Sequence, residues 1–264
     1  MSNNLPHNDE DVLDWLKQEH DQPFGGWDFS YLKDRRVFLQ EHAWDYAETV
    51  LPYLKQAQSV LDIDTGGGEI FRSLLDRAQF KGKARAIEPY PPNVTVARET
   101  LTPLSVKVID NSADAADLGD QKFDLMISRH GGSLSPANIA QRLKPGGRFI
   151  SEQIGDRTNQ ELHEIFGSGS TSSDEWPHNA GDARQVFAEE SLLIEDLQEQ
   201  HITTRYMDVG AFAYYLKAVP WEVPDFSINA YAEVLLSLHR QAQEQGYALD
   251  TTFHVYLIIA RAPR

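Results

Sequence analysis

A glycine-rich turn that follows a short apolar segment is the clearest chemical signal in the sequence. The segment 59–63 reads Ser-Val-Leu-Asp-Ile, and Thr65 is followed by Gly66, Gly67 and Gly68. Glycine adopts positive φ at low cost and lets the backbone approach a ligand closely. A helix that begins directly after such a turn presents free N–H groups, which bind a carboxylate well. The turn therefore predicts a site for a small ligand that carries an acidic group.

A carboxylate in the next predicted strand adds to this signal. Glu88 ends that strand, 20 residues after Gly68. At this place in an α/β fold a carboxylate can accept hydrogen bonds from both hydroxyls of a ribose. A dinucleotide site requires a third glycine where Phe71 stands, so a nicotinamide-dependent enzyme is the weaker interpretation. A glycine turn that only reverses the chain remains the alternative without function.

Two further candidates, Arg129 and His130, come directly after the predicted strand 123–128. In a parallel sheet the carboxyl ends of the strands form the edge where ligands bind. His130 at this edge is a candidate general base for a hydroxyl or amine. Arg129 is a candidate for binding an acidic group of the substrate. Structural roles stay open as alternatives, because His130 can bond a loop carbonyl and Arg129 can pair with a nearby carboxylate.

A regular alternation of strands and helices between residues 59 and 155 must position these residues. Apolar, β-rich segments alternate with segments whose apolar residues recur at helical spacing. Such alternation favours parallel strands joined by right-handed crossovers, and hence a doubly wound α/β sheet of the Rossmann type. The predicted strands of this part are 59–63, 84–88, 106–109, 123–128 and 148–152.

The N-terminal part of the chain is predicted to be helical. Apolar residues between Val12 and Leu16 indicate a short helix, and a second helical stretch is predicted over about 34–55. Residues 1–55 are therefore expected to form an N-terminal helical segment, and residues 56–264 the main domain.

The C-terminal part is predicted to hold a helical insertion and a last strand. Residues 208–246 are mostly helical in pattern, with a last helix that Ser227 caps and Gly246 ends. The segment 252–259 is predicted to be a buried strand. The polar, glycine-rich segment 167–181 is predicted to be a surface loop that can serve as a lid.

The charge of the chain restricts its partners. Lys and Arg number 24 against 40 Asp and Glu, so the formal net charge is −16. This charge repels phosphate backbones, and no run of basic residues makes an exception, so DNA and RNA are disfavoured as substrates. A small neutral or cationic substrate fits better. An acidic surface that only keeps the protein soluble is the simpler interpretation.

The composition also bears on metals and location. The sequence has no cysteine, and His163-Glu164 lacks the second histidine of a metalloprotease motif, so no metal site is expected. The N-terminus lacks the basic and apolar regions of a secretory signal. The apolar segment 255–260 is too short to span a bilayer. We therefore expect a cytoplasmic protein without membrane contact, while the sequence does not specify the oligomeric state.

The motifs at 62–68 and 88 resemble the core of class I S-adenosylmethionine (SAM)-dependent methyltransferases. The first motif of that family is an acidic residue followed by alternating glycines, which Asp62, Gly66 and Gly68 match. The resemblance implies that this turn holds the methionine part of SAM, with the acidic residue near its ammonium group. It also implies that Glu88 binds the ribose.

Later segments extend the resemblance over about residues 56–155. Asp114 and Ala115 lie where the family places its adenine-binding segment, and the strand that ends at Ser128 resembles the fourth strand of the family. The turn 143–147, Leu-Lys-Pro-Gly-Gly, resembles the one before its fifth strand. The resemblance therefore implies cofactor contacts from Asp62, Asp64, Gly66, Gly67, Gly68, Glu88, Asp114, Ala115 and Ser128.

Asp64 is a departure from the family, which has a glycine at this position. Aspartate tolerates positive φ better than most residues. Its charge can strengthen binding of the ammonium and sulfonium groups of SAM. Its bulk can instead weaken cofactor affinity.

Segments outside the core resemble a little-characterised bacterial subgroup of these methyltransferases. They are 26–31, 129–130 and 214–221. Their aromatic residues could wall a substrate pocket, although such residues more often belong to a core. These candidates are Trp27, Tyr31, Tyr214, Tyr215 and Trp221.

The family resemblance implies a seven-stranded, mostly parallel sheet whose last strand is antiparallel, with the insertion at 208–246 covering the pocket. The resulting hypothesis is methyl transfer from SAM to an oxygen or nitrogen of a small molecule, with His130 and Arg129 as catalytic candidates. A methyltransferase that acts on RNA or other nucleic acid is one alternative. A non-catalytic SAM-binding regulatory protein is the other, and Asp64 favours it.

Overall fold

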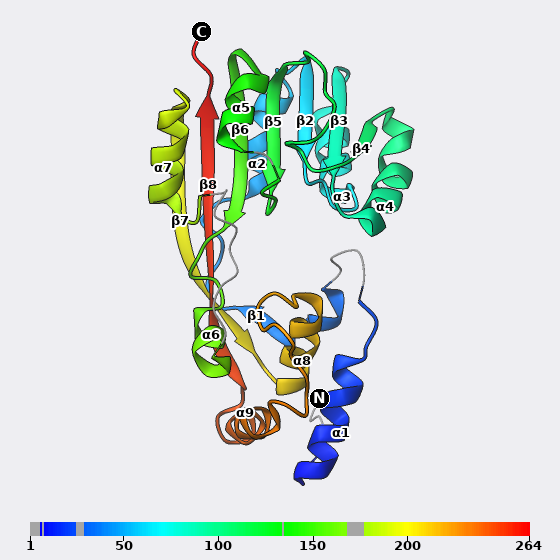
Figure 1. Ribbon diagram of the computed structural model, residues 1–264, viewed down its shortest axis with the longest axis vertical. Coiled ribbons are helices and arrows are strands. Elements are labelled where there is room, and N and C mark those ends of the chain that lie inside the picture. Colours follow the sequence, from blue (N-terminus) through cyan, green and yellow to red (C-terminus); the bar gives the residue numbers. More distant parts are fainter. Residues whose placement is uncertain (1–5, 7, 25–28, 134, 168–176) are drawn as a thin grey trace. The chain divides into compact units, whose positions relative to one another are not determined.

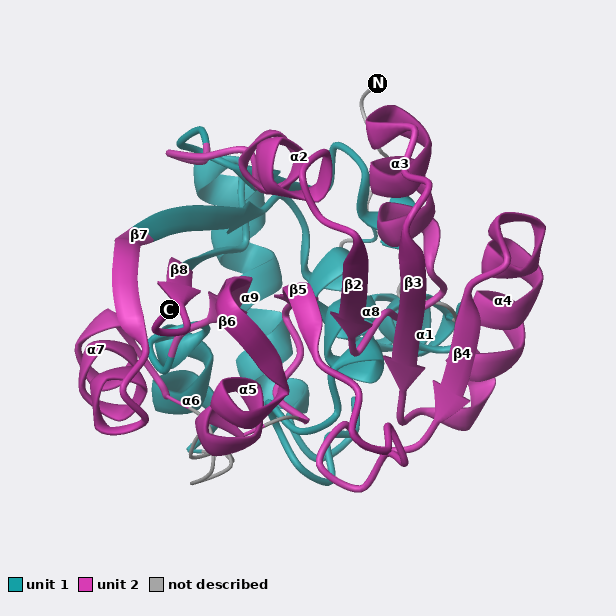
Figure 2. Ribbon diagram, turned by 90° about the horizontal axis from the view of Figure 1, so that it is seen from above, with its two compact units in different colours: residues 1–41, 156–172, 201–254 teal, residues 42–155, 173–200, 255–264 magenta. Residues whose placement is uncertain are grey.

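The computed structural model describes residues 6, 8–24, 29–133, 135–167 and 177–264 (Figure 1). The chain divides into two compact units, which Figure 2 colours separately. Unit 1 comprises residues 1–41, 156–172 and 201–254, and unit 2 comprises residues 42–155, 173–200 and 255–264. The chain passes between the units more than once, whereas the sequence predicts a single boundary at residue 55. Two long strands account for part of this difference, because β7 (Leu193–Tyr206) and β8 (Leu249–Arg261) contribute residues to both units.

Parallel strands form the centre of unit 2. β2 pairs in parallel with β3 and β5, β3 pairs with β4, and β5 pairs with β6. β8 pairs antiparallel with β6. The sheet order in the described part of the chain is β1-β7-β8-β6-β5-β2-β3-β4. The parallel strands are β2 (Ser59–Ile63), β3 (Lys83–Glu88), β4 (Lys107–Asp110), β5 (Phe123–Arg129) and β6 (Leu143–Ile154).

This topology confirms the predicted doubly wound, mostly parallel sheet with an antiparallel last strand. The strand order reverses between β2 and β5, which are neighbours although two strands separate them in the sequence. In open α/β sheets such a reversal is where ligands bind, at the carboxyl ends of the strands. The described sheet has eight strands, one more than predicted.

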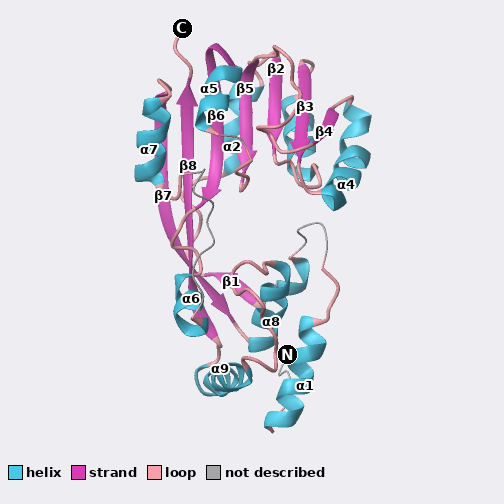
Figure 3. Cartoon of the chain, in the orientation of Figure 1, coloured by secondary structure: helices cyan, strands magenta, loops and turns pink. Residues whose placement is uncertain are grey.

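Helices cover both faces of the sheet in unit 2. α2 (Tyr46–Leu54) and α3 (Glu69–Ala78) lie on one face, and α5 (Pro136–Arg142) and α7 (Ala180–Glu189) lie on the other (Figures 2 and 3). On the second face a buried core joins the strands to these helices, and the rings of Phe149 and Phe187 stack with centroids 5.7 Å apart. α4 (Pro91–Leu101) follows β3.

The extra strand comes from the segment 34–55, for which a single helix was the wrong prediction. β1 (Arg36–Phe38) pairs antiparallel with β7. α2 begins only at Tyr46, after Asp45 accepts the N–H of Glu48 as its N-cap. A β-branched valine and a phenylalanine suit a strand, and this short segment gains backbone hydrogen bonds by pairing with β7.

Unit 1 has a hydrophobic core of its own. Buried residues of α1 (Asp9–His20), α6 (Gln160–Phe166), α8 (Val209–Ala218) and α9 (Ala232–Gln245) belong to this core. The region 208–246 is mostly helical, as predicted.

One detail of the C-terminal prediction differs from the structure. α9 begins at Ala232, later than expected, because the Oγ of Ser227 accepts the N–H of Ala230 in the preceding turn. Gly246 ends the helix with φ of +86°, as predicted. Of the predicted loop 167–181, residues 168–176 lie outside the described residues.

Candidate functional site

The turn between β2 and α3 has the backbone that the glycine pattern predicts. Gly66 and Gly68 have φ of +62° and +83°. A Cβ on Gly68 would lie 2.9 Å from the side chain of Leu101, so this glycine also permits close packing against α4. A Cβ on Gly66 would meet no atom within 4 Å. Gly66 is therefore required by conformation alone, and the space beside it is open.

Glu88 lies next to this turn. Its carboxylate accepts the N–H of Gly66 at Oε2, at 2.7 Å, and the N–H of Tyr90 at Oε1, at 2.9 Å. The residue is buried, and burial raises the pKa of its carboxyl. Each carboxylate oxygen can accept more than one hydrogen bond. Glu88 can therefore hold the glycine turn and bind the hydroxyls of a ligand at the same time.

Asp62 and Asp64 gather near Glu88 at this edge of the sheet. Burial, with repulsion from Asp64 and Glu88, raises the pKa of Asp62 to about 7. Burial also raises the pKa of Asp64. In the described part of the chain, no basic side chain opposes these shifts at either aspartate. A positively charged ligand would therefore stabilise the ionised form of these carboxyls.

Asp64 links the β2 turn to the loop that follows β5. Its carboxylate accepts the N–H of Ser133 at 2.9 Å and a hydrogen bond from the Ser133 hydroxyl. A Cβ on Gly131 would lie 2.4 Å from the Asp64 Cβ, so the two segments pack closely. Asp64 has φ of +58°, a conformation that costs an aspartate more than the glycine of the family pattern. The link spans the place where the strand order reverses.

The predicted adenine-binding residues lie in a loop tied to the start of α5. Asp114 is exposed, and its Oδ1 accepts the N–H of Ser135 at 3.0 Å and the side-chain amide of Asn138 at 2.7 Å. Ala115 is exposed beside it, and its carbonyl accepts the side-chain amide of Asn111. Part of the hydrogen-bonding capacity of Asp114 thus serves to hold this loop.

Ser128 lies deeper, at the end of β5. It is buried, and its hydroxyl donates to the carbonyl of Gly131 at 3.3 Å. The side-chain amide of Gln153 donates to the same hydroxyl at 3.5 Å and to the Gly131 carbonyl at 2.5 Å. These bonds fix the backbone of the loop that carries Gly131 and Ser133.

Arg129 and His130 converge on a buried carboxylate, Glu152. Arg129 Nε donates to Oε1 of Glu152 at 2.9 Å, and His130 Nε2 lies 2.9 Å from the same oxygen. Trp44 Nε1 donates to Oε2 at 2.6 Å. Although burial would raise it, the hydrogen bond from His130 and the charge of Arg129 hold the pKa of Glu152 at about 2. Glu152 is therefore a permanent anion with three donors around it.

The contact with Glu152 also determines the state of His130. Burial lowers the pKa of His130, and the bond to Glu152 opposes the shift without cancelling it. The ring is therefore mainly neutral at neutral pH. An anionic acceptor at Nε2 favours the tautomer with the proton on that nitrogen, which makes Nδ1 the basic nitrogen of the ring.

The sequence motifs do not identify Glu152 as a site residue. It stands at the end of the predicted strand 148–152, and β6 continues to Ile154. An acidic residue at the carboxyl end of a central parallel strand is the signal that could have identified it. The pairing of β5 with β6 places Arg129 opposite Glu152 in register.

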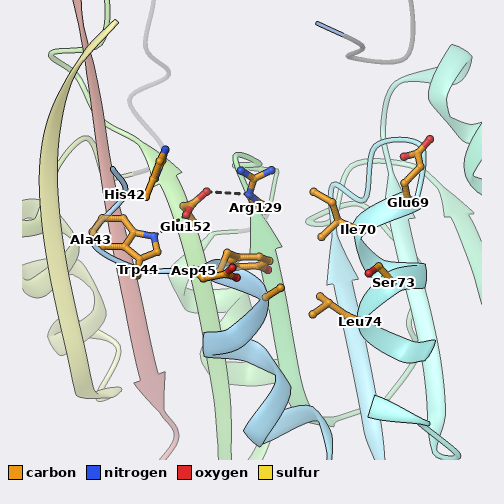
Figure 4. Close-up of a pocket in the computed structure, with 12 residues that line it drawn as sticks. His42, Ala43, Trp44, Asp45, Glu69, Ile70, Ser73, Leu74, Arg129 and Glu152 are labelled. Atoms are coloured by element: carbon orange, nitrogen blue, oxygen red, sulfur yellow. Dashed lines mark hydrogen bonds and ion pairs between the residues drawn. The ribbon is translucent and has the colours of Figure 1, made fainter. Parts of the chain in front are cut away.

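A pocket of 740 Å³ opens beside these residues in unit 2 (Figure 4). One wall comes from the segment 42–47 at the start of α2, and the other from Glu69, Ile70, Ser73 and Leu74 of α3. Arg129 and Glu152 line it as well. Figure 4 shows Ile70 and Leu74 pointing from α3 toward the α2 side.

Tyr46 is the buried polar residue of this pocket that lacks a partner. Its side chain lines the pocket with 7% of the residue exposed, and in the described structure its hydroxyl has no hydrogen-bond partner. The guanidinium carbon of Arg129 lies 6.0 Å from the centre of its ring. A buried hydroxyl without a partner costs free energy, which a bound ligand would recover.

The aromatic residues proposed from the sequence lie elsewhere. Tyr214 and Tyr215 are buried in the core of unit 1, as the structural alternative predicts. Tyr31 and Trp221 are partly exposed residues of the same unit. Trp27 lies outside the described residues.

Among the described helices, none is long and apolar enough to cross a membrane. The sequence matches no known protein family, and no curated protein matches it significantly. Its fold, by contrast, is similar to those of several solved structures.

One similar structure is a proposed methyltransferase from Bacillus halodurans, with a TM-score of 0.58 and 18% identity over 83% of this chain and 99% of that one. Another is a chain from the complex of the Haloferax volcanii Trm112 methyltransferase activator and a proposed methyltransferase. Its TM-score is 0.52, with 17% identity over 95% of this chain and 98% of that one. A third is the [4+2]-cyclase SpnF, with a TM-score of 0.50 and 15% identity over 87% of this chain and 86% of that one. This chain therefore has the same Rossmann-like α/β fold as the proposed methyltransferase from Bacillus halodurans.

Proposed function

We propose that the protein is a SAM-dependent methyltransferase that transfers a methyl group to an oxygen or nitrogen of a small molecule. The observation that carries this proposal is the pairing of an open glycine turn with a buried carboxylate. Glu88 is held beside Gly66 by a hydrogen bond of 2.7 Å, at the carboxyl edge of a doubly wound sheet. Two of the similar structures are described as proposed methyltransferases or their complexes, which supports the choice of reaction.

The residues at this edge fit SAM by charge and by space. The first N–H groups of α3 suit the carboxylate of the methionine part, and Gly66 leaves room for it. Asp62 would face the ammonium group, and Glu88 would accept the ribose hydroxyls. A cluster of buried carboxyls that no basic side chain of the described residues neutralises suits a ligand that carries a sulfonium and an ammonium.

Bound SAM supplies a methyl group that its sulfonium already activates. The chain must therefore orient the acceptor and remove its proton, and orientation alone is worth on the order of 7–11 kcal/mol. His130 is the proposed base, because it is mainly neutral and Glu152 orients its ring. Arg129 is proposed to bind the substrate rather than to exchange protons, since guanidinium stays protonated.

There are two alternatives to this function. Asp64, with its charge and positive φ where the family pattern has a glycine, favours a non-catalytic SAM-binding protein as the first alternative. A methyltransferase that acts on RNA or other nucleic acid is the second alternative. The net charge of −16 favours a small molecule over RNA.

Calorimetric titration with SAM, S-adenosylhomocysteine (SAH) and NAD tests the proposal. We expect saturable binding of SAM and SAH, no binding of NAD, and at least about a tenfold loss of SAM affinity in Glu88→Ala, because two ligand hydrogen bonds disappear. Glu99→Ala, an exposed change on α4, is the matched control and should bind as the unchanged chain does. Absence of SAM and SAH binding would refute the proposal.

Turnover separates the enzyme from the regulatory alternative. Incubation with SAM and a panel of hydroxyl and amine acceptors should produce SAH, and His130→Ala should slow this by about a hundredfold, as loss of a general base does. Tight SAM binding without turnover on any acceptor, unaltered by His130→Ala, would favour the regulatory protein instead.

A further inference from the structure

In the pocket beside Arg129 and Glu152, the hydroxyl of Tyr46 has no acceptor within the described part of the chain. We propose that this pocket binds the carboxylate of an organic acid with an apolar body, held by the terminal nitrogens of Arg129 and the hydroxyl of Tyr46. That this acid is the methyl acceptor rests on the proposed function. The carboxylate site itself rests on the contacts described next.

Arg129 is held in a fixed orientation with donors to spare. Its Nε is bound to Glu152 at 2.9 Å, and in Figure 4 its two terminal nitrogens lie on the far side of the guanidinium from that contact. A guanidinium carries five N–H donors in a planar fork, which matches the two oxygens of a carboxylate. Because Glu152 accepts from Trp44 and His130 as well, its charge is shared among three donors.

Tyr46 lines the same pocket, and its hydroxyl is buried without a hydrogen-bond partner in the described chain. Burial, with repulsion from the carboxyls of Asp62 and Glu152, raises the pKa of Tyr46 well above its usual value. The phenol therefore remains a protonated donor at every physiological pH. It finds no acceptor within the described chain, so an oxygen of a ligand is the group that would satisfy it.

The other carboxylates of the pocket are engaged or face elsewhere. Asp45 accepts the N–H of Glu48 as the N-cap of α2. The carboxylate of Glu69 folds over Gly67, where an added Cβ would meet its Oε1 at 2.3 Å, and Figure 4 shows it pointing away from Trp44. In the described chain no hydrogen bond joins either carboxylate to Arg129 or to the hydroxyl of Tyr46, so neither replaces a ligand carboxylate there.

Apolar side chains complete the pocket and define the rest of the ligand. Trp44 is held by its bond to Glu152, and Ile70 lines the opposite wall with 44% of the residue exposed. Leu74 lies one turn further along α3 and also lines the wall. A ring or alkyl chain between these walls would remove apolar surface from water while its carboxylate meets Arg129 and Tyr46.

Three matched probes test the proposal on the full chain. Phenylacetate, phenylacetamide and phenethylamine share one apolar body and differ in the charge of the polar end. We expect phenylacetate to bind at least about tenfold tighter than phenethylamine in titrations followed by NMR, because its oxygens meet two donors, one of them charged. Each titration is run with and without saturating SAH.

Variants identify the donors. Tyr46→Phe and Arg129→Lys should each weaken phenylacetate about tenfold, since each removes a hydrogen bond or its fork geometry. Tyr53→Phe, on the same helix and also under an arginine, and Arg98→Lys, in an exposed pair with Asp110, are the controls and should bind as the unchanged chain does. Circular dichroism confirms that the variants fold.

The outcomes separate this proposal from the proposed function. Phenylacetate binding that depends on Arg129 and Tyr46 in a chain that binds neither SAM nor SAH would uphold the carboxylate site and refute the methyltransferase. Equal binding of the three probes, or no saturable phenylacetate binding, would overturn the carboxylate site. Loss of SAH binding in Tyr46→Phe, equal to the loss of phenylacetate, would also overturn it, because the pocket would then belong to the cofactor.

Discussion

Asp62 is the residue whose protonation should report binding of SAM. Burial and the neighbouring carboxyls raise its pKa to about 7, so the folded protein holds a proton that the unfolded chain has already lost. The free energy of unfolding therefore falls as the pH rises from the ordinary aspartate value to about 7. A ligand that brings positive charge favours the ionised form. We predict that binding of SAM just below neutral pH releases a proton from Asp62.

Calorimetry in two buffers of different ionisation enthalpy measures this release. The observed heats should differ between the buffers for SAM, and the difference should be smaller for SAH, which lacks the sulfonium charge. Asp62→Asn should remove the part of the release that depends on this carboxyl. Equal heats in both buffers for the unchanged chain would contradict the role given to Asp62.

Glu152 should determine the titration of His130. Its carboxylate stabilises the protonated ring and opposes the effect of burial on the pKa of His130. We predict that Glu152→Gln lowers this pKa further, so that the acid limb of the pH–rate profile moves to lower pH. The ring should also lose its fixed tautomer, and the maximal rate should fall. Titration of the histidine ring signals by NMR gives the pKa directly.

Glu161→Gln is the matched control, because Glu161 is also partly buried and accepts hydrogen bonds from Thr252 in unit 1. It should leave the His130 signal unchanged. A Glu152→Gln variant whose stability falls while its pH profile stays in place would show that Glu152 is only structural.

At the level of elements, the two glycines with positive φ in the β2–α3 turn have different steric requirements, which substitutions can distinguish. Gly66 needs positive φ but has open space, whereas Gly68 needs positive φ and also lies against Leu101. We predict that Gly66→Ala lowers the free energy of unfolding by about 1–2 kcal/mol, the cost of the left-handed conformation. Gly68→Ala should lower the free energy of unfolding by roughly 1–3 kcal/mol more than Gly66→Ala does, because the added methyl group also overpacks against α4. Urea denaturation of both variants measures the difference, and equal losses would contradict it.

The strands that a sequence predicts best are those buried on both faces. The segments 59–63 and 123–128 are mostly apolar and buried, as parallel central strands require, and each lies within the strand observed. β1 could not be predicted, because a segment of three residues shows too little periodicity. In addition, β1 pairs with residues of β7 that lie more than 160 positions away in the sequence. Such pairing is a property of the tertiary structure, which local pattern does not contain.

The residues of the candidate site show the same contrast between local sequence signals and tertiary contacts. Gly66, Gly68 and Glu88 could be found because the motif is local and each residue type has a distinct backbone or charge requirement. Glu152 and Tyr46 could not, because their roles depend on strands and helices that meet only in the fold. Asp64 departs from the glycine of the family pattern in the sequence itself, whereas its bond to Ser133 across the strand reversal exists only in the folded chain.

The fold of the whole molecule restricts the reaction less than the site does. A [4+2]-cyclase is similar to this chain at a TM-score of 0.50, as a proposed methyltransferase is at 0.58. One architecture therefore serves different chemistry, and function must be argued from side chains. Here those side chains are the acidic cluster around Asp62 and the donors around Glu152.

The charge of the whole molecule leads to a prediction about its acceptor. With a formal net charge of −16, the protein should not bind RNA at physiological ionic strength, because phosphate affinity depends on the basic side chains that displace counterions. Fluorescence anisotropy of labelled single-stranded and hairpin RNA, followed across a salt series, measures this. Salt screens charges beyond about 8 Å under these conditions, so a local basic groove would still reveal itself as saturable binding that weakens steeply with salt. Such binding would favour RNA as the acceptor. Its absence, together with phenylacetate binding that depends on Arg129, would leave a small organic acid as the acceptor that the pocket supports.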